Sequence, residues 1–142
     1  MSSDKTADAE TKVVADFVLG EAVRLLEKFG EFFPIASSMS LDGEADYVMA
    51  DIDDDMPPSD ELIDLYVASF KQEAAEGTIK CVAIAYEIFV RDRNSDRKRD
   101  AIAIRLEHES GKASLWVNPY ELTGGKVVLG AHYSELLERK IF

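Results

Sequence analysis

The chain has 142 residues, of which 46% are hydrophobic and 31% are charged, and its net charge is −12. This length and composition are typical of one soluble domain over residues 1–142, whose core is large enough to need no disulfides. No apolar run approaches the roughly 20 residues that span a bilayer, and the N-terminal residues lack the apolar region of a secretory signal. We therefore expect a cytoplasmic protein with no membrane association. The single cysteine, Cys81, lies in an apolar stretch and predicts a buried thiol.

The charge is unevenly distributed along the chain. Residues 1–76 contain 19 acids and 5 bases, whereas residues 77–142 contain 9 acids and 11 bases. The negative surface argues against a nucleic-acid partner, because such binding needs cationic groups that displace counterions. It is compatible with a basic protein partner, although charge also serves solubility alone.

In the first half of the chain, hydrophobic periodicity predicts two helices around a hairpin. The first helix covers Ala7–Phe29, and we expect residues 1–6 to be disordered. Asp42-Gly43 is typical of a tight turn between two strands, predicted over Phe33–Leu41 and Glu44–Ile52. The second helix is predicted over Asp60 to about Ala75.

Glycine, proline and serine residues mark where the predicted helices begin and end. Gly30 fits the C-cap of the first helix, and Gly77 ends the second. Pro57-Pro58 blocks any earlier start of the second helix, so Ser59 is the predicted N-cap.

The second half of the chain predicts strands. Thr78–Val90 is apolar on both faces, which favours a central strand. The charged connection RDRNSDRKRD (91–100) leads to a strand over Ala101–His108, in which Arg105 and Glu107 lie on the polar face. The next strand, ASLWVNPY (113–120), is expected to end at Asn118-Pro119, KVVLGAHY (126–133) is a short final strand, and SELLERKIF (134–142) is a helical turn and tail.

The predicted order of elements is α-β-β-α-β-β-β-β. Strands joined by tight turns are mostly antiparallel neighbours. We therefore predict an α+β fold with a mostly antiparallel sheet of five to six strands and both main helices packed on one face.

Two quoted segments carry a resemblance. LLEKFGEFFPIASSMSLDGE (25–44) followed by PPSDELIDLYVASFKQEAAEG (57–77) resembles an uncharacterised family of small bacterial α+β proteins with no known activity. These share a helix ending in a Phe-Gly-Glu-Phe-type motif, a hairpin with Asp-Gly and a second helix. The element order is also similar to roadblock and profilin-like scaffolds. The resemblance covers most of the chain and implies a fold, but no functional residues.

The acidic stretch DIDDDMPPSDEL (51–62) is the strongest candidate for a site. An EF-hand loop needs Gly at position 6 and Glu at position 12, where this chain has Met56 and Leu62. Asp60 and Glu61 are explained by the start of the second helix, whose dipole favours anions. The remaining acids need water, a cation or a basic partner nearby. We predict no metal site, and we assign partner binding to Asp51, Asp53, Asp54, Asp55 and Asp64.

Other candidate groups are weaker. His108 and His132 end predicted strands, where a two-histidine carboxylate metal site is conceivable but an exposed histidine is the better interpretation. The sequence contains no phosphate-binding glycine loop, nucleophile elbow or Cys-x-x-Cys motif, so we predict no catalytic residues and no cofactor.

The first choice of function is a non-enzymatic acidic protein that binds a basic protein partner, for example an immunity-type protein that masks a cationic toxin. The alternative is a small-molecule-binding protein or enzyme with a pocket between helices and sheet near Tyr47, Tyr86 and Trp116. A third class is a homodimer that uses the edge strand Lys126–Tyr133.

Overall fold

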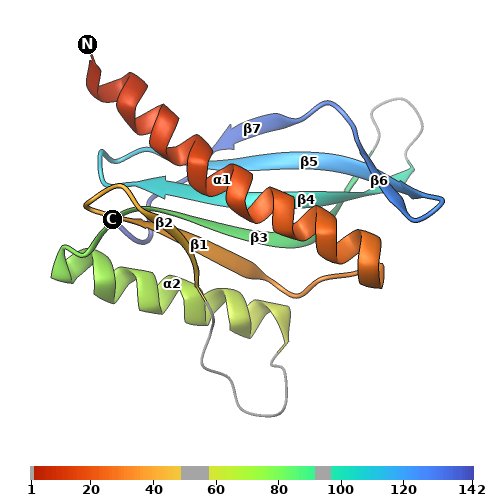
Figure 1. Ribbon diagram of the computed structural model, residues 1–142, viewed down its shortest axis with the longest axis horizontal. Helices are drawn as coiled ribbons and strands as arrows, with labels where there is room; N and C mark the ends of the chain where they lie inside the picture. Colours follow the sequence, from red (N-terminus) through yellow and green to blue (C-terminus); the bar gives the residue numbers. More distant parts are fainter. Residues whose placement is uncertain (1, 49–57, 92–96) are drawn as a thin grey trace.

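The computed structural model describes residues 2–48, 58–91 and 97–142, which form two helices and seven strands. Figure 1 shows how these elements are arranged. In chain order the elements are α1 (Ser2–Phe29), β1 (Ile35–Ser40), β2 (Ala45–Val48), α2 (Ser59–Glu76), β3 (Ile79–Arg91), β4 (Lys98–His108), β5 (Ala113–Thr123), β6 (Lys126–Leu129) and β7 (Tyr133–Leu136). The predicted order is confirmed up to β6. α1 begins at Ser2 rather than Ala7, so residues 2–6, which we expected to be disordered, are helical.

The strands form one antiparallel sheet in the spatial order β2-β1-β3-β4-β5-β6, with β7 also paired to β5. The α+β class is therefore confirmed, and β3 is central as predicted. β7 adds a strand where we predicted a helical turn. Because Tyr133–Leu136 pairs with Ser114–Val117, the open edge of β5 decides the conformation of this segment.

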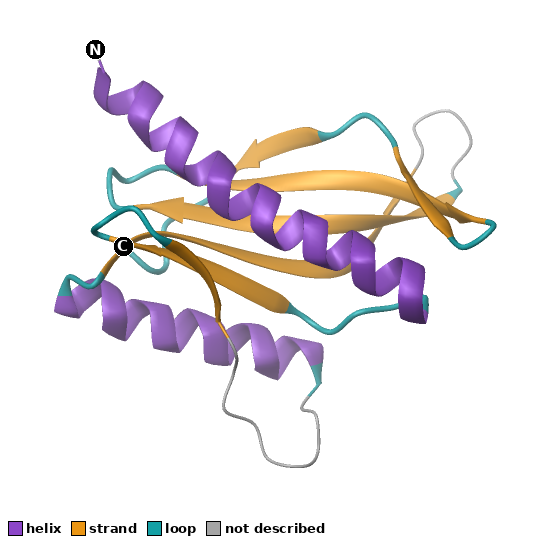
Figure 2. Ribbon diagram, in the orientation of Figure 1, coloured by secondary structure: helices purple, strands orange, loops and turns teal. Residues whose placement is uncertain are grey.

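The two helices cover opposite faces of the sheet, which corrects the prediction that both pack on one face. Successive side chains of a strand point to opposite faces, and those of β3 are apolar on both. Cys81 and Ala83 pack in the core under α1, whereas Val82 and Ile84 pack in the core under α2. One helix layer would leave an apolar face of β3 in water, so each face has its own helix (Figure 2).

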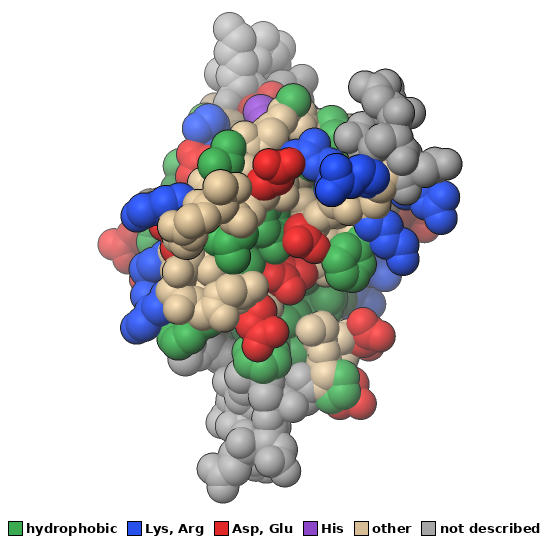
Figure 3. Space-filling view, turned by 90° about the vertical axis from the view of Figure 1, so that its right-hand side faces the viewer, with side chains coloured by type: hydrophobic (Ala, Val, Ile, Leu, Met, Phe, Trp, Pro, Cys, Tyr) green, Lys and Arg blue, Asp and Glu red, His purple; other side chains and the backbone are tan. Residues whose placement is uncertain are grey.

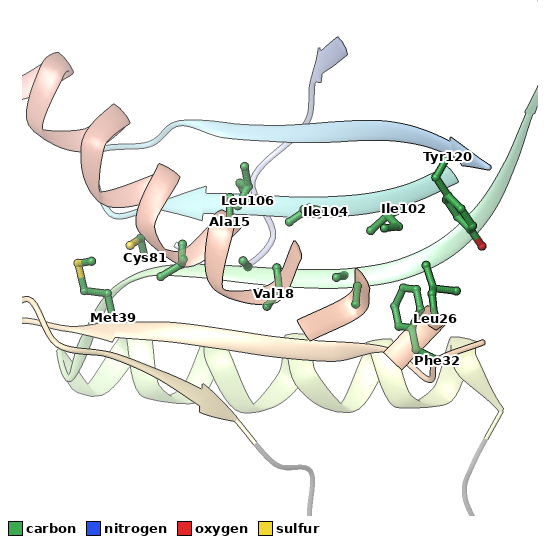
Figure 4. Packing of buried hydrophobic residues seen from close by; sticks show 14 residues of the cluster. Ala15, Val18, Leu26, Phe32, Met39, Cys81, Ile102, Ile104, Leu106 and Tyr120 are labelled. Carbon is green, nitrogen blue, oxygen red and sulfur yellow. The ribbon is translucent and has the colours of Figure 1, made fainter. Parts of the chain in front are cut away.

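The larger core lies between α1 and the middle of the sheet (Figure 4). Ala15, Val18 and Leu26 of α1 face the strands, because their 3–4 spacing places them on one side of the helix. The opposing side chains come mainly from β3, β4 and β5: Cys81, Ala83, Ala85, Ile102, Ile104, Leu106 and Tyr120.

Glycine turns lie where the sequence predicted them, but the start of α2 differs. Gly43 has a φ of 91° and its N–H donates to the Ser40 carbonyl, closing the first hairpin. Gly77 caps α2 with a φ of 73°. At the other end Pro58 is the N-cap and Ser59 is already helical, so the predicted Ser59 cap is wrong and no side-chain hydrogen bond caps this end.

β5 continues past Asn118-Pro119 to Thr123, although we predicted that it would end there. The carbonyl of Pro119 accepts a hydrogen bond from Gly130 N–H at 2.7 Å. In an antiparallel strand, the N–H and C=O groups of one residue point to the same neighbouring strand. An N–H at position 119 would therefore point, like the carbonyl, to the segment around Gly130. Here, between β6 and β7, the ladder is interrupted and its register slips by one residue. The proline is tolerated because it coincides with this break.

Candidate functional site

Of the five aspartates predicted to bind a partner, one lies in the described part of the chain. Asp64 is exposed on α2. Asp51, Asp53, Asp54 and Asp55 fall within residues 49–57, outside the described residues. The question of an acidic surface therefore rests on Asp64 and on the acids around it.

The three aromatic residues predicted to line a pocket are not brought together. Tyr47 lies on edge strand β2, with its ring 4.5 Å from that of Phe17 in α1. Tyr86 packs in the core under α2, on the opposite face of the sheet. Trp116 lies on β5 and stacks on His132, with ring centroids 6.1 Å apart. The strand order places β1, β3 and β4 between Tyr47 and Trp116.

The β1–β2 hairpin and α2 form a surface that we call the acidic face. Val48 of β2 packs against the core under α2, so the two elements adjoin. Residues 35–48 and 59–77 contain one base, Lys71, against eight acids, all of them exposed or half-buried. These acids are Asp42, Glu44, Asp46, Asp60, Glu61, Asp64, Glu73 and Glu76.

The acids of the acidic face have no ion-pair partner among the described residues, whereas several acids of α1 have one. Asp8 pairs with Lys112 at 2.9 Å and Asp16 with Lys12 at 2.8 Å. Glu21 pairs with Arg24. The negative charge of the acidic face is thus left to solvent or to another molecule.

An apolar side chain is exposed within this negative surface. Leu65 of α2 is 49% exposed and, with Glu61 and Asp64, lines a shallow hollow of about 340 Å³. Leu41, in the hairpin turn, is also more than half exposed. Apolar anchors surrounded by polar groups are the usual composition of a protein–protein contact.

A buried polar cluster joins α1 to the end of the sheet. His108 is 6% exposed, which corrects the prediction of an exposed strand-end histidine. Its Nδ1 accepts the Ser110 backbone N–H at 3.0 Å, so the ring proton is on Nε2, which donates to the Glu10 carboxylate at 2.9 Å. Lys80 pairs with the other oxygen of Glu10. The polar groups of Glu10, Lys80 and His108 are therefore paired with one another, and the cluster holds the first turns of α1 on β3 and β4.

Cys81 lies beside this cluster but is not arranged as a nucleophile. It is directly opposite His108 on the neighbouring strand. Both ring nitrogens of His108 are already engaged, so neither is available to take the thiol proton. Burial, and then the charge of Glu10, raise the pKa of the Cys81 thiol to about 12. At neutral pH this side chain is a protonated core residue.

Glu107 is the polar residue that sequence reasoning placed wrongly. The sequence placed it on the polar face of its strand with Arg105, but it is 1% exposed. Its Oε1 accepts the backbone N–H groups of Lys140 and Ile141, both at 3.0 Å, and its Oε2 accepts Arg105 Nε at 2.9 Å. Ile141 is buried in the core under α2. Glu107 therefore fixes the C-terminal tail over the sheet. The signal in the sequence was the apolar Ile141-Phe142 end, which needs a place to be buried.

Comparison of the chain with models of known protein families, with curated proteins and with solved structures finds no match. Within the described residues, neither helix has an apolar stretch long enough to cross a membrane. In the same part of the chain, no three His, Cys, Asp or Glu side chains are grouped as they would be to hold a metal ion.

Proposed function

We propose that the protein is a non-enzymatic binding protein whose acidic face docks a basic protein partner. The observation that supports this most directly is the contrast in pairing described above: the adjoining hairpin and α2 carry eight acids without an ion-pair partner among the described residues. Such a surface attracts a cationic protein over long range and accelerates its encounter.

The exposed Leu65 gives the acidic face a second means of recognition. Charged groups at the rim of a contact set specificity and association rate, while buried apolar anchors supply most of the affinity. Leu65, flanked by Glu61 and Asp64, suits a partner segment in which lysines or arginines flank an apolar side chain. An immunity-type protein that masks a cationic toxin is one form of this proposal.

The test is affinity capture from a lysate of the source cells with two charge-reversal variants of equal net charge. Glu61→Lys/Asp64→Lys alters the acidic face, and Glu109→Lys/Glu135→Lys alters two exposed acids elsewhere. We expect wild type and the second variant to retain the same protein at low salt, and the first variant to lose it. High salt should release it, because exposed charges are screened.

Retention of the same protein by Glu61→Lys/Asp64→Lys would contradict the proposal. Equal loss with both variants would also contradict it, because net charge rather than the acidic face would then govern binding. Reversal of Asp53, Asp54 and Asp55 in a third variant extends the test to the acids predicted from sequence.

A second candidate function, self-association, is favoured by the open edge formed by β6 and β7. Val128 is 58% exposed and Leu136 93%, and Leu129 and Tyr133 are also exposed. No described strand pairs with the outer side of this edge. An exposed apolar edge strand is a template for pairing with a second copy of the chain.

Light scattering over a range of concentrations tests this second candidate. We expect the mass of two chains for wild type and of one chain for Val128→Lys/Leu136→Lys. A single-chain mass for wild type at every concentration excludes it.

A further inference from the structure

The sheet opens at one end, where β4 and β5 separate. Pairing between them stops at Ala101 opposite Pro119. Beyond that point residues 98–100 of β4 pair with β3 alone, and residues 120–123 of β5 pair with β6 alone, among the described residues. Two strand edges therefore border the opening, and alternate residues of each direct backbone N–H and C=O groups into it with no partner strand among the described residues. We call this opening the β4–β5 cleft.

The position of the β5–β6 hairpin explains why the strands separate. The N–H of Val127 donates to the Glu27 carboxylate in α1 at 2.9 Å, and the Val127 side chain packs against the core under α1. The hairpin is thus held towards α1, while the first residues of β4 continue with β3. In Figure 1 the β5–β6 hairpin and the start of β4 leave the sheet in different directions. The cleft is a consequence of this anchoring.

The lining of the cleft is strongly polar and carries three consecutive bases. It has a volume of about 600 Å³, within the range of roughly 300–1,000 Å³ that is usual for ligand pockets. Its lining residues are Arg97, Lys98, Arg99, Asp100, Tyr120, Glu121, Leu122 and Thr123. Figure 3 looks onto this end of the molecule, where Lys and Arg side chains gather on the right of the view.

Within the part of the chain that the structure describes, the three bases have no ion pair, although the protein has an excess of acids. Neither Arg97, Lys98 nor Arg99 has a salt-bridge partner among the described residues. The Nε of Arg99 is buried without a hydrogen-bond acceptor. Since 28 acidic residues are present in the chain, unpaired neighbouring bases indicate that this end is built to receive an anion.

We propose that the β4–β5 cleft binds an extended acidic polypeptide segment by strand addition. Its backbone pairs with the free edge of residues 98–100 or 120–123, and its acidic side chains pair with Arg97 and Lys98. The exposed Leu122 contacts an alternate apolar side chain of the segment. Free strand edges favour a polypeptide over other anions, because only a backbone matches their donors and acceptors.

The net charge of the protein does not prevent this binding. The hairpin part of the acidic face lies at the β2 edge, and β1, β3 and β4 separate it from β5, whereas α2 packs under β3. At about 4.8 Å between strands this is roughly 20 Å. The Debye length is about 10 Å at 0.1 M salt, so the charge of the hairpin is largely screened at the cleft, whose own lining has three bases and the two acids Asp100 and Glu121.

The test uses a fluorescent hexapeptide of alternating glutamate and valine, titrated into the full chain and followed by anisotropy at 0.1 M salt. We expect saturable binding that weakens about tenfold in Arg97→Glu/Lys98→Glu. The matched control Lys28→Glu/Lys71→Glu has the same net charge and should bind as wild type does. Arg99 is left unchanged because its buried Nε makes it a structural residue.

Two comparisons distinguish strand addition from a simple anion site. A peptide with proline at the third position cannot donate from that residue, and we expect it to bind at least fivefold more weakly. Amide hydrogen exchange should slow within residues 98–100, or at Tyr120 and Leu122, when the parent peptide binds. Equal binding of the proline peptide, displacement by millimolar inorganic phosphate with no change in exchange, or absence of binding would each overturn the proposal. These results leave the acidic-face proposal untouched, because its variants and its capture experiment involve other residues.

Discussion

Acidic residues occur in two settings in this protein, and the difference separates those that hold the fold from those available to a partner. Glu10 and Glu107 are largely enclosed, and both oxygens of each have donors: those of Glu10 come from distant strands, and those of Glu107 from the distant C-terminal tail and from Arg105 on the same strand. On the acidic face, Asp46, Glu61 and Asp64 are exposed and have no ion-pair partner among the described residues.

The physical reason is the cost of removing charge from water. A carboxylate that is buried without donors loses its hydration and destabilises the fold, so burial requires several compensating hydrogen bonds. An exposed carboxylate keeps its hydration and contributes little to folding. Acids of the first kind are expected to change stability when replaced, and acids of the second kind to change association.

The largest effect is expected at Glu107. Glutamine has one acceptor oxygen where glutamate has two, so Glu107→Gln leaves either Arg105 or the backbone N–H groups of Lys140 and Ile141 without an acceptor. We therefore expect a loss of about 3 kcal/mol in the free energy of unfolding. Urea denaturation measures this loss.

Glu109→Gln is the matched control for Glu107, because it is the same change at an exposed residue two positions further along the chain. It should alter stability by no more than about 0.5 kcal/mol. If both substitutions cost the same, Glu107 does not hold the tail in solution, and the comparison of the two settings fails.

Local patterns predicted most of the secondary structure of this chain. The Asp42-Gly43 turn, the Gly77 stop and the two apolar faces of β3 each depend on nearby residues, and all are found as expected. Those two faces also contained the evidence against a single helix layer, because a central strand that is apolar on both sides needs a cover on each.

The contacts between residues far apart in the chain could not be predicted from the sequence. From the sequence, Glu107 was expected on the polar face of its strand and His108 at an exposed strand end. Their burial depends on Glu10, 98 residues away from His108, and on Lys140 and Ile141, more than 30 residues away from Glu107. No periodicity encodes such pairs. The β4–β5 cleft was missed for a similar reason, since the separation of β4 and β5 follows from a contact between Glu27 and Val127.

A smaller effect, and a dependence on pH, is expected at Glu10. Burial raises the pKa of this carboxyl, but the hydrogen bonds from Lys80 and His108, together with the positive charge of Lys80, outweigh burial and hold the pKa below its ordinary value of 4.5. A pKa lowered by folding means that the stabilisation is complete above the unfolded value and disappears as the pH falls through the folded value.

Glu10→Gln should therefore cost about 1 kcal/mol at pH 7 and less at pH 3, because below the unfolded value of 4.5 the unfolded chain already gains the proton and the stabilisation by the charge of Glu10 declines. Urea denaturation of both proteins across this range gives the difference at each pH. A constant difference from pH 7 to pH 3 would show that the substitution acts through packing rather than through the charge of Glu10.

The smallest effect on folding is expected on the acidic face. Asp46→Asn/Asp64→Asn should change the free energy of unfolding by no more than about 0.5 kcal/mol, with a slight gain expected because mutual repulsion falls. Thermal unfolding measures the stability, and capture of the basic partner measures the association. Unchanged stability with weakened capture is the combination expected of acids that serve a partner. A clear loss of stability would instead show that Asp46 and Asp64 hold the fold, as Glu107 does. That result would contradict the proposal that the acidic face is a binding surface.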